Sequence, residues 1–341
     1  MIRKEDRISA AQIGEALGLT RQAINRHIIR LIEDGLVVRE GRTRGAIYAP
    51  VQPGAKAQRT SIVTFLKTYR VAGLEEDQVF LEVSHMIGLE RALSTEARRI
   101  AAYAFTEMLN NVIEHSESSE CRVEVTLASR ILDITIRDFG IGVFYSVSSK
   151  LGLGSEEEAI GVLLKGKGTT MPERHAGEGI FFTSKSCDHF SLRSHRMELS
   201  LGSRAEDSHV SVRRFLKGTE VSVIVRKSAR RKLEKIFSAF APEEYDFRFE
   251  RTMVSVRLFP QEYLTRSEAR RLVSRLESFR EAVLDFQGVK SIGQAFADEI
   301  FRVFPRMHPS VKVSFINAAP PIEAVIRHVI DNGISPELTI G

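Results

Sequence analysis

The alternation of apolar and polar positions divides the chain into three segments. In the first, apolar residues recur at helical spacing over residues 9–16 and 20–32, and strand patterns follow at 36–39 and 46–48. A small polar residue precedes each helical stretch and a glycine follows it, as helix caps require. The polar stretch up to residue 60 contains proline and glycine and predicts a linker. We therefore expect a small winged domain at the N-terminus.

The second segment, about residues 61–235, begins with helices and continues with strands. Apolar spacing predicts helices over 77–89 and 95–116, and alternation predicts strands at 121–128 and 131–137. A glycine-rich stretch follows over 140–179. Further strands are expected at 189–202, 208–216 and 219–226.

The third segment alternates strand and helix patterns. Strands are expected near 253–259, 282–286 and 311–317, and helices near 266–279, 292–304 and 320–332. This alternation predicts a small α/β domain. The chain is thus expected to be a multidomain α+β protein with domains at 1–60, 61–235 and 236–341.

Composition narrows the class of protein. With 341 residues, 43% hydrophobic and 27% charged, the chain is long enough for two or three domains and too apolar to be disordered. No run of 18 apolar residues occurs, and the first residues lack the apolar segment of a secretory signal. Cys121 and Cys187 have no disulfide or metal-ligand spacing. We expect no membrane span and a cytoplasmic location.

Positive charge is concentrated at the N-terminus. Residues 1–60 contain 11 Lys or Arg against 6 Asp or Glu, whereas the remaining residues contain 38 of each. The net charge of +5 therefore belongs to the first segment. Such an asymmetry favours an anionic partner there, most often a nucleic acid.

A candidate DNA-reading helix begins at Thr20. It presents polar side chains on one outward face, and the expected hairpin tip carries two arginines, which can bond base edges or phosphates. Residues 9–14, 19–27 and 34–37 resemble a winged helix-turn-helix. The resemblance implies DNA binding, with a winged helix used for protein contact as the alternative. The expected contact residues are Thr20, Arg21, Gln22, Asn25, Arg26, Arg42 and Arg44.

The helix over 95–116 carries a candidate catalytic pair. Glu107 and Asn111 are four residues apart and share a face beside an apolar stripe. Burying a carboxylate or a carboxamide costs free energy, so a polar pair beside an apolar stripe indicates a function. A magnesium ion held by the Asn111 oxygen and a water polarised by Glu107 would account for the pair.

Glycines follow at positions that suit a nucleotide. Asp138 ends a strand and is followed by Gly140 and Gly142, so its carboxylate can accept a hydrogen bond from an adenine amino group while backbone approaches the ligand. Gly177 and Gly179 open a probable helix whose free amides suit phosphates.

The remaining residues of this stretch complete the expected site. The glycines between 152 and 168, with Lys165 and Lys167, suit a mobile lid that closes over phosphate. Thr219, which follows Gly218 at the start of a strand, is placed to contact the base edge.

In order and spacing these motifs resemble the ATPase family of gyrase, the heat-shock chaperone, histidine kinases and MutL, over about 175 residues. The resemblance implies an α/β sandwich that binds ATP and Mg²⁺, with Glu107 as general base, Asn111 as the magnesium ligand and Asp138 on adenine. A domain of this fold that binds no nucleotide is the alternative. The other residues implied to bind the cofactor are Gly140, Gly142, Lys167, Gly177, Gly179 and Thr219.

Residues 281–301 resemble STAS-like domains and are similar to anti-sigma-factor antagonists, which a kinase phosphorylates on a serine at the start of the helix. In this chain residues 293–295 align with that serine, and Ser291 is expected in the preceding loop. We therefore expect a module for protein partners rather than a phosphoacceptor.

Together the segments predict an ATP-responsive regulator that binds DNA and hydrolyses ATP slowly. The family resemblance also implies a nucleotide-gated homodimer. A serine kinase acting on a STAS-like partner is the alternative. A MutL-like DNA-processing ATPase is disfavoured because residues 236–341 show no nuclease-like metal cluster.

Overall fold

The computed structural model describes residues 62–167, 178–202, 207–259 and 263–331. In the N-terminal segment it describes short stretches at 8–9, 12–13, 28, 31, 37–40 and 47–50. Chain contacts define two compact units. One comprises Met1–Thr64 and Thr126–Leu132, and the other comprises Phe65–Val125 and Asp133–Gly341.

The N-terminal segment contains a three-stranded sheet of order β1-β3-β2, with β1 (Ile8–Ser9), β2 (Val37–Glu40) and β3 (Ile47–Pro50). Strand β3 pairs antiparallel with both neighbours. The two predicted wing strands are confirmed. Strand β1 was not predicted; it ends at Ser9, the residue expected to cap the first helix, and its Ile8 is buried against β3.

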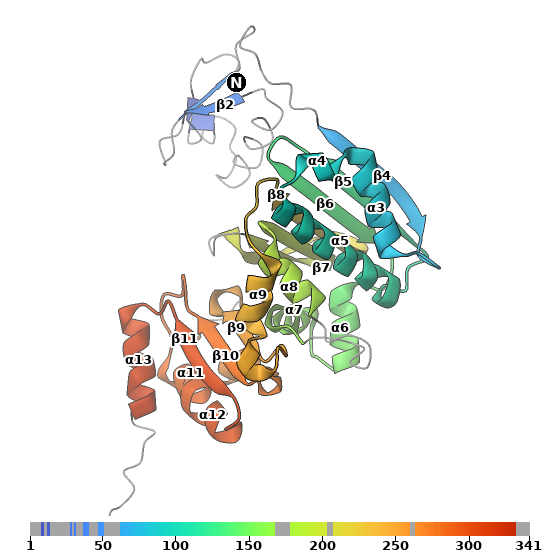
Figure 1. Cartoon of the computed structure of the whole chain (residues 1–341). Coiled ribbons are helices and arrows are strands. Elements are labelled where there is room, and N and C mark those ends of the chain that lie inside the picture. Colours follow the sequence, from blue (N-terminus) through green and yellow to red (C-terminus); the bar gives the residue numbers. More distant parts are fainter. Residues whose placement is uncertain are drawn as a thin grey trace, which may run out of the picture. The chain divides into compact units, whose positions relative to one another are not determined.

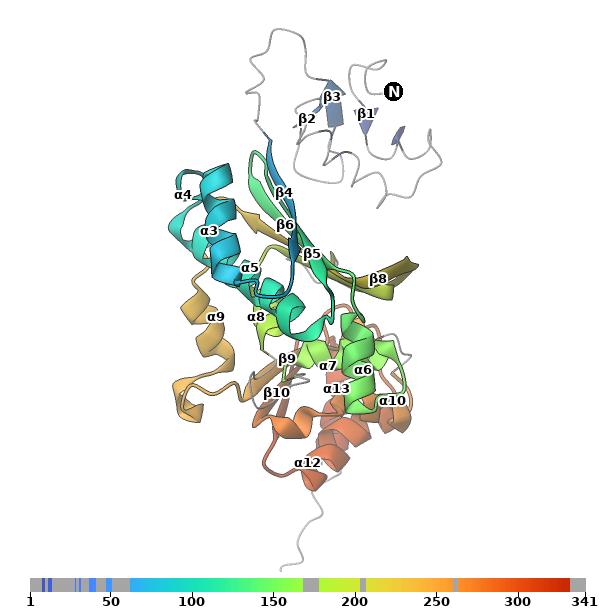
Figure 2. The same ribbon diagram turned by 90° about the vertical axis from the view of Figure 1, so that its right-hand side faces the viewer.

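The middle segment is built on a five-stranded sheet of order β4-β5-β6-β8-β7. Helices α3 and α5 lie across one face of this sheet (Figure 1), and the turned view shows α8 on the same side (Figure 2). The strands are β4 (Val63–Arg70), β5 (Glu120–Leu127), β6 (Ile131–Asp138), β7 (His189–Gly202) and β8 (His209–Arg226). The helices are α3 (Glu76–Ile87), α4 (Leu89–Ala92), α5 (Thr95–His115), α6 (Val143–Leu151), α7 (Glu156–Lys165), α8 (Gly179–Ser186) and α9 (Leu233–Phe240).

Helix α5 forms where its sequence pattern predicted. The Ser94 hydroxyl accepts a hydrogen bond from the amide of Ala97 at 3.2 Å, which caps the first turn. One face of the helix is apolar and buried against the sheet; its members are Ala97, Ile100, Ala101, Ala104, Phe105, Met108, Leu109 and Val112. This burial fixes the rotation of α5, so that Met108 and Val112 of the apolar face line the candidate cavity together with Glu107 and Asn111.

Two parts of the middle segment differ from what the sequence pattern predicted. Helix α6, which Gly152 ends in the left-handed conformation, was not predicted. The range 152–168, expected to be a mobile lid, contains helix α7, which Ser155 caps. The strands predicted at 208–216 and 219–226 form one strand, β8. Gly218, with φ of 79°, carries the chain through an irregularity in the pairing with β7.

The C-terminal segment is a parallel three-stranded sheet of order β11-β10-β9 with helices around it, as its sequence alternation predicted. Helical structure continues from Gln294 to Met307 through a π-helical turn. The strands are β9 (Arg251–Ser255), β10 (Glu281–Asp285) and β11 (Lys312–Ile316). The helices are α10 (Arg266–Val273), α11 (Gln294–Asp298), the π turn Glu299–Val303, α12 (Phe304–Met307) and α13 (Pro320–Asp331). Short 3-10 turns lie at Glu243–Tyr245, Val256–Leu258 and Leu276–Ser278.

The middle and C-terminal segments share one apolar core. Phe181 and Phe182 of α8 belong to the same buried cluster as Phe249, Leu284 and Phe296. The two segments therefore pack as one body, although the sequence predicted them as separate domains.

Candidate functional site

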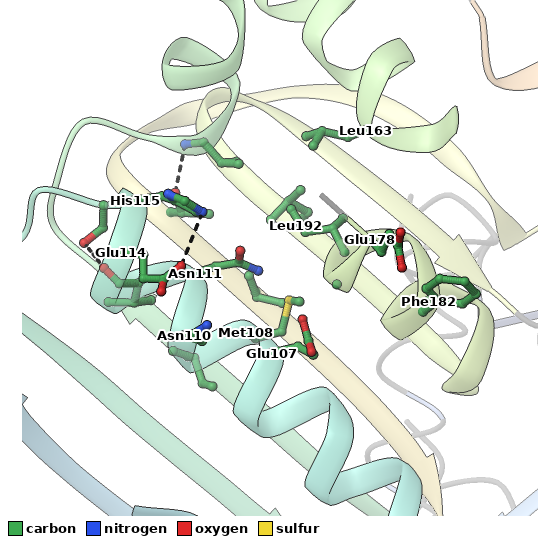
Figure 3. Close-up of a pocket in the computed structure, with 18 of the residues that line it drawn as sticks. Glu107, Met108, Asn110, Asn111, Glu114, His115, Leu163, Glu178, Phe182 and Leu192 are labelled. Carbon is green, nitrogen blue, oxygen red and sulfur yellow. Dashed lines mark hydrogen bonds and ion pairs between the residues drawn. The ribbon is translucent and has the colours of Figure 1, made fainter. Parts of the chain in front are cut away.

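A cavity of about 540 Å³ opens beside the sheet, between α5, α6 and α8. Glu107 and Asn111 on α5 face Glu178 and Phe182 across it (Figure 3). The wall includes five of the nine nucleotide-site residues selected from the sequence, namely Glu107, Asn111, Asp138, Gly179 and Thr219. These residues come from four separate elements, α5, β6, α8 and β8, which the fold brings to one cavity.

Helix α5 supplies Glu107 and Asn111 from adjacent turns. The Nδ2 atom of Asn111 is buried and has no hydrogen-bond partner within the described protein. A buried polar atom without a partner is rare in native proteins and indicates a missing water, ion or ligand. The Asn111 amide therefore supports the prediction of a bound polar ligand at this position.

Glu107 lies directly against the start of α8. A Cβ atom at Gly179 would fall 2.1 Å from Glu107 Oε2, so only glycine allows this approach. The first amides of α8 consequently lie beside a carboxylate at the cavity wall. A helix N-terminus carries partial positive charge, which suits an anionic group bound near Glu107.

Asp138, at the end of β6, is almost completely buried at the cavity wall, with 2% of its surface exposed. The amides of Gly140 and Thr219 both donate to its Oδ1 atom, at 2.9 and 3.2 Å. Burial raises the pKa of Asp138, and these hydrogen bonds oppose that rise. Thr219 in turn accepts a hydrogen bond from the amide of Val143 through Oγ1, at 3.0 Å. The carboxylate is therefore oriented by two backbone amides, one from the loop after β6 and one from β8.

The loop after β6 depends on glycine. A Cβ atom at Gly140 would lie 1.7 Å from the carbonyl oxygen of Ser116, so any side chain would collide with backbone. Gly142 has φ of 83°, a conformation that other residues rarely adopt, and it precedes α6. Both glycines border the site through the backbone they position rather than as members of its wall.

Lys167 lies elsewhere. Its ammonium is 3.1 Å from Glu250 Oε2 and donates to the carbonyl oxygen of Ser278 at 2.7 Å. Lys165 is buried and donates to the carbonyl oxygens of Arg271 and Ser274 at the end of α10, at 3.3 and 2.8 Å. The expectation of two lid lysines over phosphate is thus corrected, because packing against the C-terminal domain draws both ammonium groups away from the cavity.

The cavity wall is acidic within the described part of the chain. Four carboxylates line it and no Lys or Arg among the described residues does; the carboxylates are Glu107, Glu114, Asp138 and Glu178. Burial raises the pKa of Glu178, and the charge of Lys167 partly offsets that rise. A bound polyanion would therefore need cations with it.

The wall fits Mg²⁺ carried by a phosphate ligand better than a permanent metal centre. No group of three or more His, Cys, Asp or Glu side chains within the described ranges is placed to hold a metal ion. Protein sites for Mg²⁺ with nucleotides typically use one or two side-chain oxygens and complete the octahedron with phosphates and water. Asn111 offers such an oxygen.

Sequence reasoning missed several residues of the wall. Ser146 and Val147 belong to α6, which was not predicted; the apolar residues at 143, 144 and 147 were the available signal. A group of aromatic residues at the cavity wall was also missed. It combines one residue from each of α5, α8 and α9 with a loop residue: Tyr103, Phe182, Phe237 and Phe247.

Some predicted positions lie outside the described residues. Gly177 is one of them. The predicted DNA contacts are the others: Thr20, Arg21, Gln22, Asn25, Arg26, Arg42 and Arg44. Ser291 is described and lies exposed in the loop before α11, as expected, since α11 begins at Gln294 with Gly293 as its cap.

Comparison with known families identifies both ends of the chain. Residues 1–38 match a family described as winged helix-turn-helix DNA-binding, and residues 268–323 match one described as a STAS-like domain of unknown function. No curated protein matches the chain. The predictions of an N-terminal winged helix-turn-helix and a C-terminal STAS-like domain are therefore confirmed. Neither match reaches the cavity.

The winged helix indicates a regulatory, DNA-binding protein. None of the helices in the described part of the chain combines the length and apolarity that crossing a bilayer requires.

Proposed function

We propose that the cavity binds ATP together with Mg²⁺, and that bound nucleotide controls DNA binding by the winged helix. The proposal assigns the middle segment to the ATPase family of gyrase, the heat-shock chaperone, histidine kinases and MutL. The observation that carries it is the buried Asp138 carboxylate, oriented by two backbone amides at the wall of a cavity that also holds the unsatisfied Asn111 amide.

Each wall residue has a task in this proposal. Asp138 accepts a hydrogen bond from the adenine amino group, and Thr219 fixes the carboxylate through its amide. Asn111 holds Mg²⁺ through Oδ1, which directs its Nδ2 toward a phosphate oxygen. The start of α8 offers amides to the phosphates. Mg²⁺, when bound, neutralises phosphate charge beside the acidic wall.

Glu107 is the general base of the proposed hydrolysis. Its carboxylate takes a proton from a water molecule as the water oxygen forms a bond to the terminal phosphorus. The bond from that phosphorus to the bridging oxygen breaks, and ADP and phosphate leave. Positioned general bases typically contribute about 10²–10⁴-fold to rate. We expect Glu107→Gln to bind ATP and to hydrolyse it at least about 100-fold more slowly.

Isothermal titration with ATP and Mg²⁺ tests nucleotide binding. We expect heat of binding for the wild type and a loss of about tenfold or more in affinity for Asp138→Asn, because Asn offers the amino group a carbonyl oxygen in place of a charged acceptor. Asp133→Asn is the matched control: it lies on the same strand and its Oδ1 accepts from Ser222 at 3.3 Å, away from the cavity wall. Absence of heat with the wild type would refute the proposal.

Mobility-shift assays with genomic DNA fragments, with and without ATP and Mg²⁺, test the regulatory part. Arg21 and Arg26 replaced together by alanine should weaken a salt-sensitive complex, because each lost phosphate contact reduces counterion release. Lys56 and Arg59 replaced together, in the predicted linker, provide a control of equal charge. A DNA affinity that is the same with and without nucleotide would contradict control by ATP.

Labelled-phosphate transfer distinguishes hydrolysis from the alternative activity. Release of free phosphate from [γ-³²P]ATP supports the ATPase, whereas label on a separate STAS-like protein would establish a serine kinase instead. The predicted homodimer is tested in the same samples by light scattering with and without nucleotide.

A further inference from the structure

Ser146 is the most deeply buried hydroxyl of the cavity wall without an explanation. Its side chain is 4% exposed, and its Oγ atom has no hydrogen-bond partner within the described protein. Residue 146 nevertheless lines the cavity. Leaving a buried hydroxyl without a hydrogen bond costs free energy, so a ligand that bonds this hydroxyl would explain a serine at position 146.

The fold ties Ser146 to Asp138 through a short chain of contacts. The amide of Ser146 donates to the carbonyl oxygen of Gly142 at 2.9 Å, which places Ser146 in the first turn of α6. The amide of Val143, at the start of the same turn, donates to Thr219, and Thr219 donates its own amide to Asp138. The backbone of Ser146 and the Asp138 carboxylate thus belong to one hydrogen-bonded frame at the cavity wall, whereas the Ser146 hydroxyl has no partner within it.

Their chemistry is complementary. Asp138 as a carboxylate only accepts hydrogen bonds, whereas the Ser146 hydroxyl can also donate one. A donor and an acceptor on the wall of one cavity can match the edge of an aminopurine, in which an exocyclic amino group donates beside a ring nitrogen that accepts. Guanine has the acceptor O6 in place of that amino group; beside O6 its N1 is protonated, whereas its N7 accepts as in adenine.

We infer that Ser146 donates a hydrogen bond to a ring nitrogen beside the amino group of the bound base. Contact with N1 would add to the selection of adenine over guanine that Asp138 makes at the amino group, because N1 of guanine carries a proton. The ring nitrogen is N1 or N7, the two acceptors that flank the amino group. This inference rests on the proposed function, since it assigns the base specificity of the same cavity.

Affinity measurements with base analogues test it. ATP, 1-deaza-ATP, 7-deaza-ATP and GTP are titrated with Mg²⁺ into the full-length wild type, Ser146→Ala and Ser148→Ala. Ser148 is the matched control, because it lies on the same helix, is also buried and donates its hydroxyl to the Tyr145 carbonyl oxygen at 3.0 Å. Thermal melting without nucleotide checks that each variant is folded.

We expect Ser146→Ala to bind ATP roughly tenfold more weakly and Ser148→Ala to stay within about twofold of the wild type. One deaza analogue should lose about tenfold on the wild type and nothing further on Ser146→Ala, and its identity gives the nitrogen contacted. GTP should bind far more weakly than ATP to the wild type.

The inference is overturned if both deaza analogues bind the wild type as tightly as ATP, or if Ser146→Ala loses no affinity. The analogue comparison uses unaltered protein, so it stands even if a variant fails to fold. Wild-type protein that binds none of the nucleotides would instead refute the proposed function itself.

Discussion

The two ends of the segment 138–167, residues 138–142 and 161–167, each contain two glycines and at least one charged residue but have different surroundings. The first end borders the cavity, where Asp138 is oriented by the amides of Gly140 and Thr219. The second end is fastened to the C-terminal domain, where Lys165 and Lys167 donate to carbonyl oxygens at and after the end of α10. From sequence alone, both ends were expected to serve the ligand.

The comparison shows that the role of a glycine or a lysine depends on the element that packs against it. At position 161 a Cβ atom would lie 2.8 Å from the Phe259 ring, so this glycine permits contact between α7 and the C-terminal domain. Lys165 donates to carbonyls at the end of α10, where the helix dipole favours a cation, whereas Lys167 pairs with Glu250 and donates to Ser278 beyond that helix. One end of the segment therefore borders the cavity proposed to bind a nucleotide, and the other contacts the C-terminal domain.

The largest effect is expected at the cavity end. Gly140→Ala should destabilise the fold by roughly 3 kcal/mol or more, because its Cβ would lie 1.7 Å from a backbone oxygen that has no room to move. Urea unfolding measures the change. Gly154→Ala, whose Cβ would approach only the flexible Glu158 side chain at 3.3 Å, is the control and should cost far less. Equal losses would show that the close approach after β6 is not required.

An intermediate effect is expected from Lys165. Burial lowers its pKa to about 7, against 10.5 in the unfolded chain. Between those pH values the unfolded chain still carries a proton on this side chain that the folded chain has released, so the free energy of unfolding rises as the pH increases from 7. The free energy of unfolding of the wild type minus that of Lys165→Met should therefore increase by up to about 1.4 kcal/mol per pH unit between pH 7.5 and 9.5. A difference that is independent of pH would contradict the buried position.

The smallest effect distinguishes the two ends directly. Lys167→Ala should lower stability by about 1 kcal/mol or less, because its ion pair with Glu250 is partly exposed, and should change ATP affinity by less than about twofold. Asp138→Asn should instead lower ATP affinity by about tenfold or more. A tenfold loss of ATP affinity in Lys167→Ala would mean that this lysine reaches phosphate, as the sequence predicted, and would remove the contrast between the ends.

Local patterns were sufficient for much of the fold. Helix α5 was predicted within a residue at its end, because Ser94 caps it and its apolar stripe is continuous. The same stripe predicted correctly that Glu107 and Asn111 share the other face. Helix α6 was missed because glycines at positions 140, 142, 152 and 154 dominate the pattern, although two of these glycines lie just outside its ends. Because α6 was not predicted, Ser146 was not selected from the sequence as a site residue.

Regular apolar spacing was enough to predict most helices and strands, and composition was enough to locate the basic N-terminal segment and the residue types available for a nucleotide site. Which of these residues meet is set by the folded chain: the amide of Thr219 donates to Asp138 across 81 positions, and Lys167 pairs with Glu250. Helix caps and apolar periodicity report only on residues a few positions apart. Which buried groups share a cavity depends instead on sheet order and on the core that joins two segments, and neither is encoded in a local pattern.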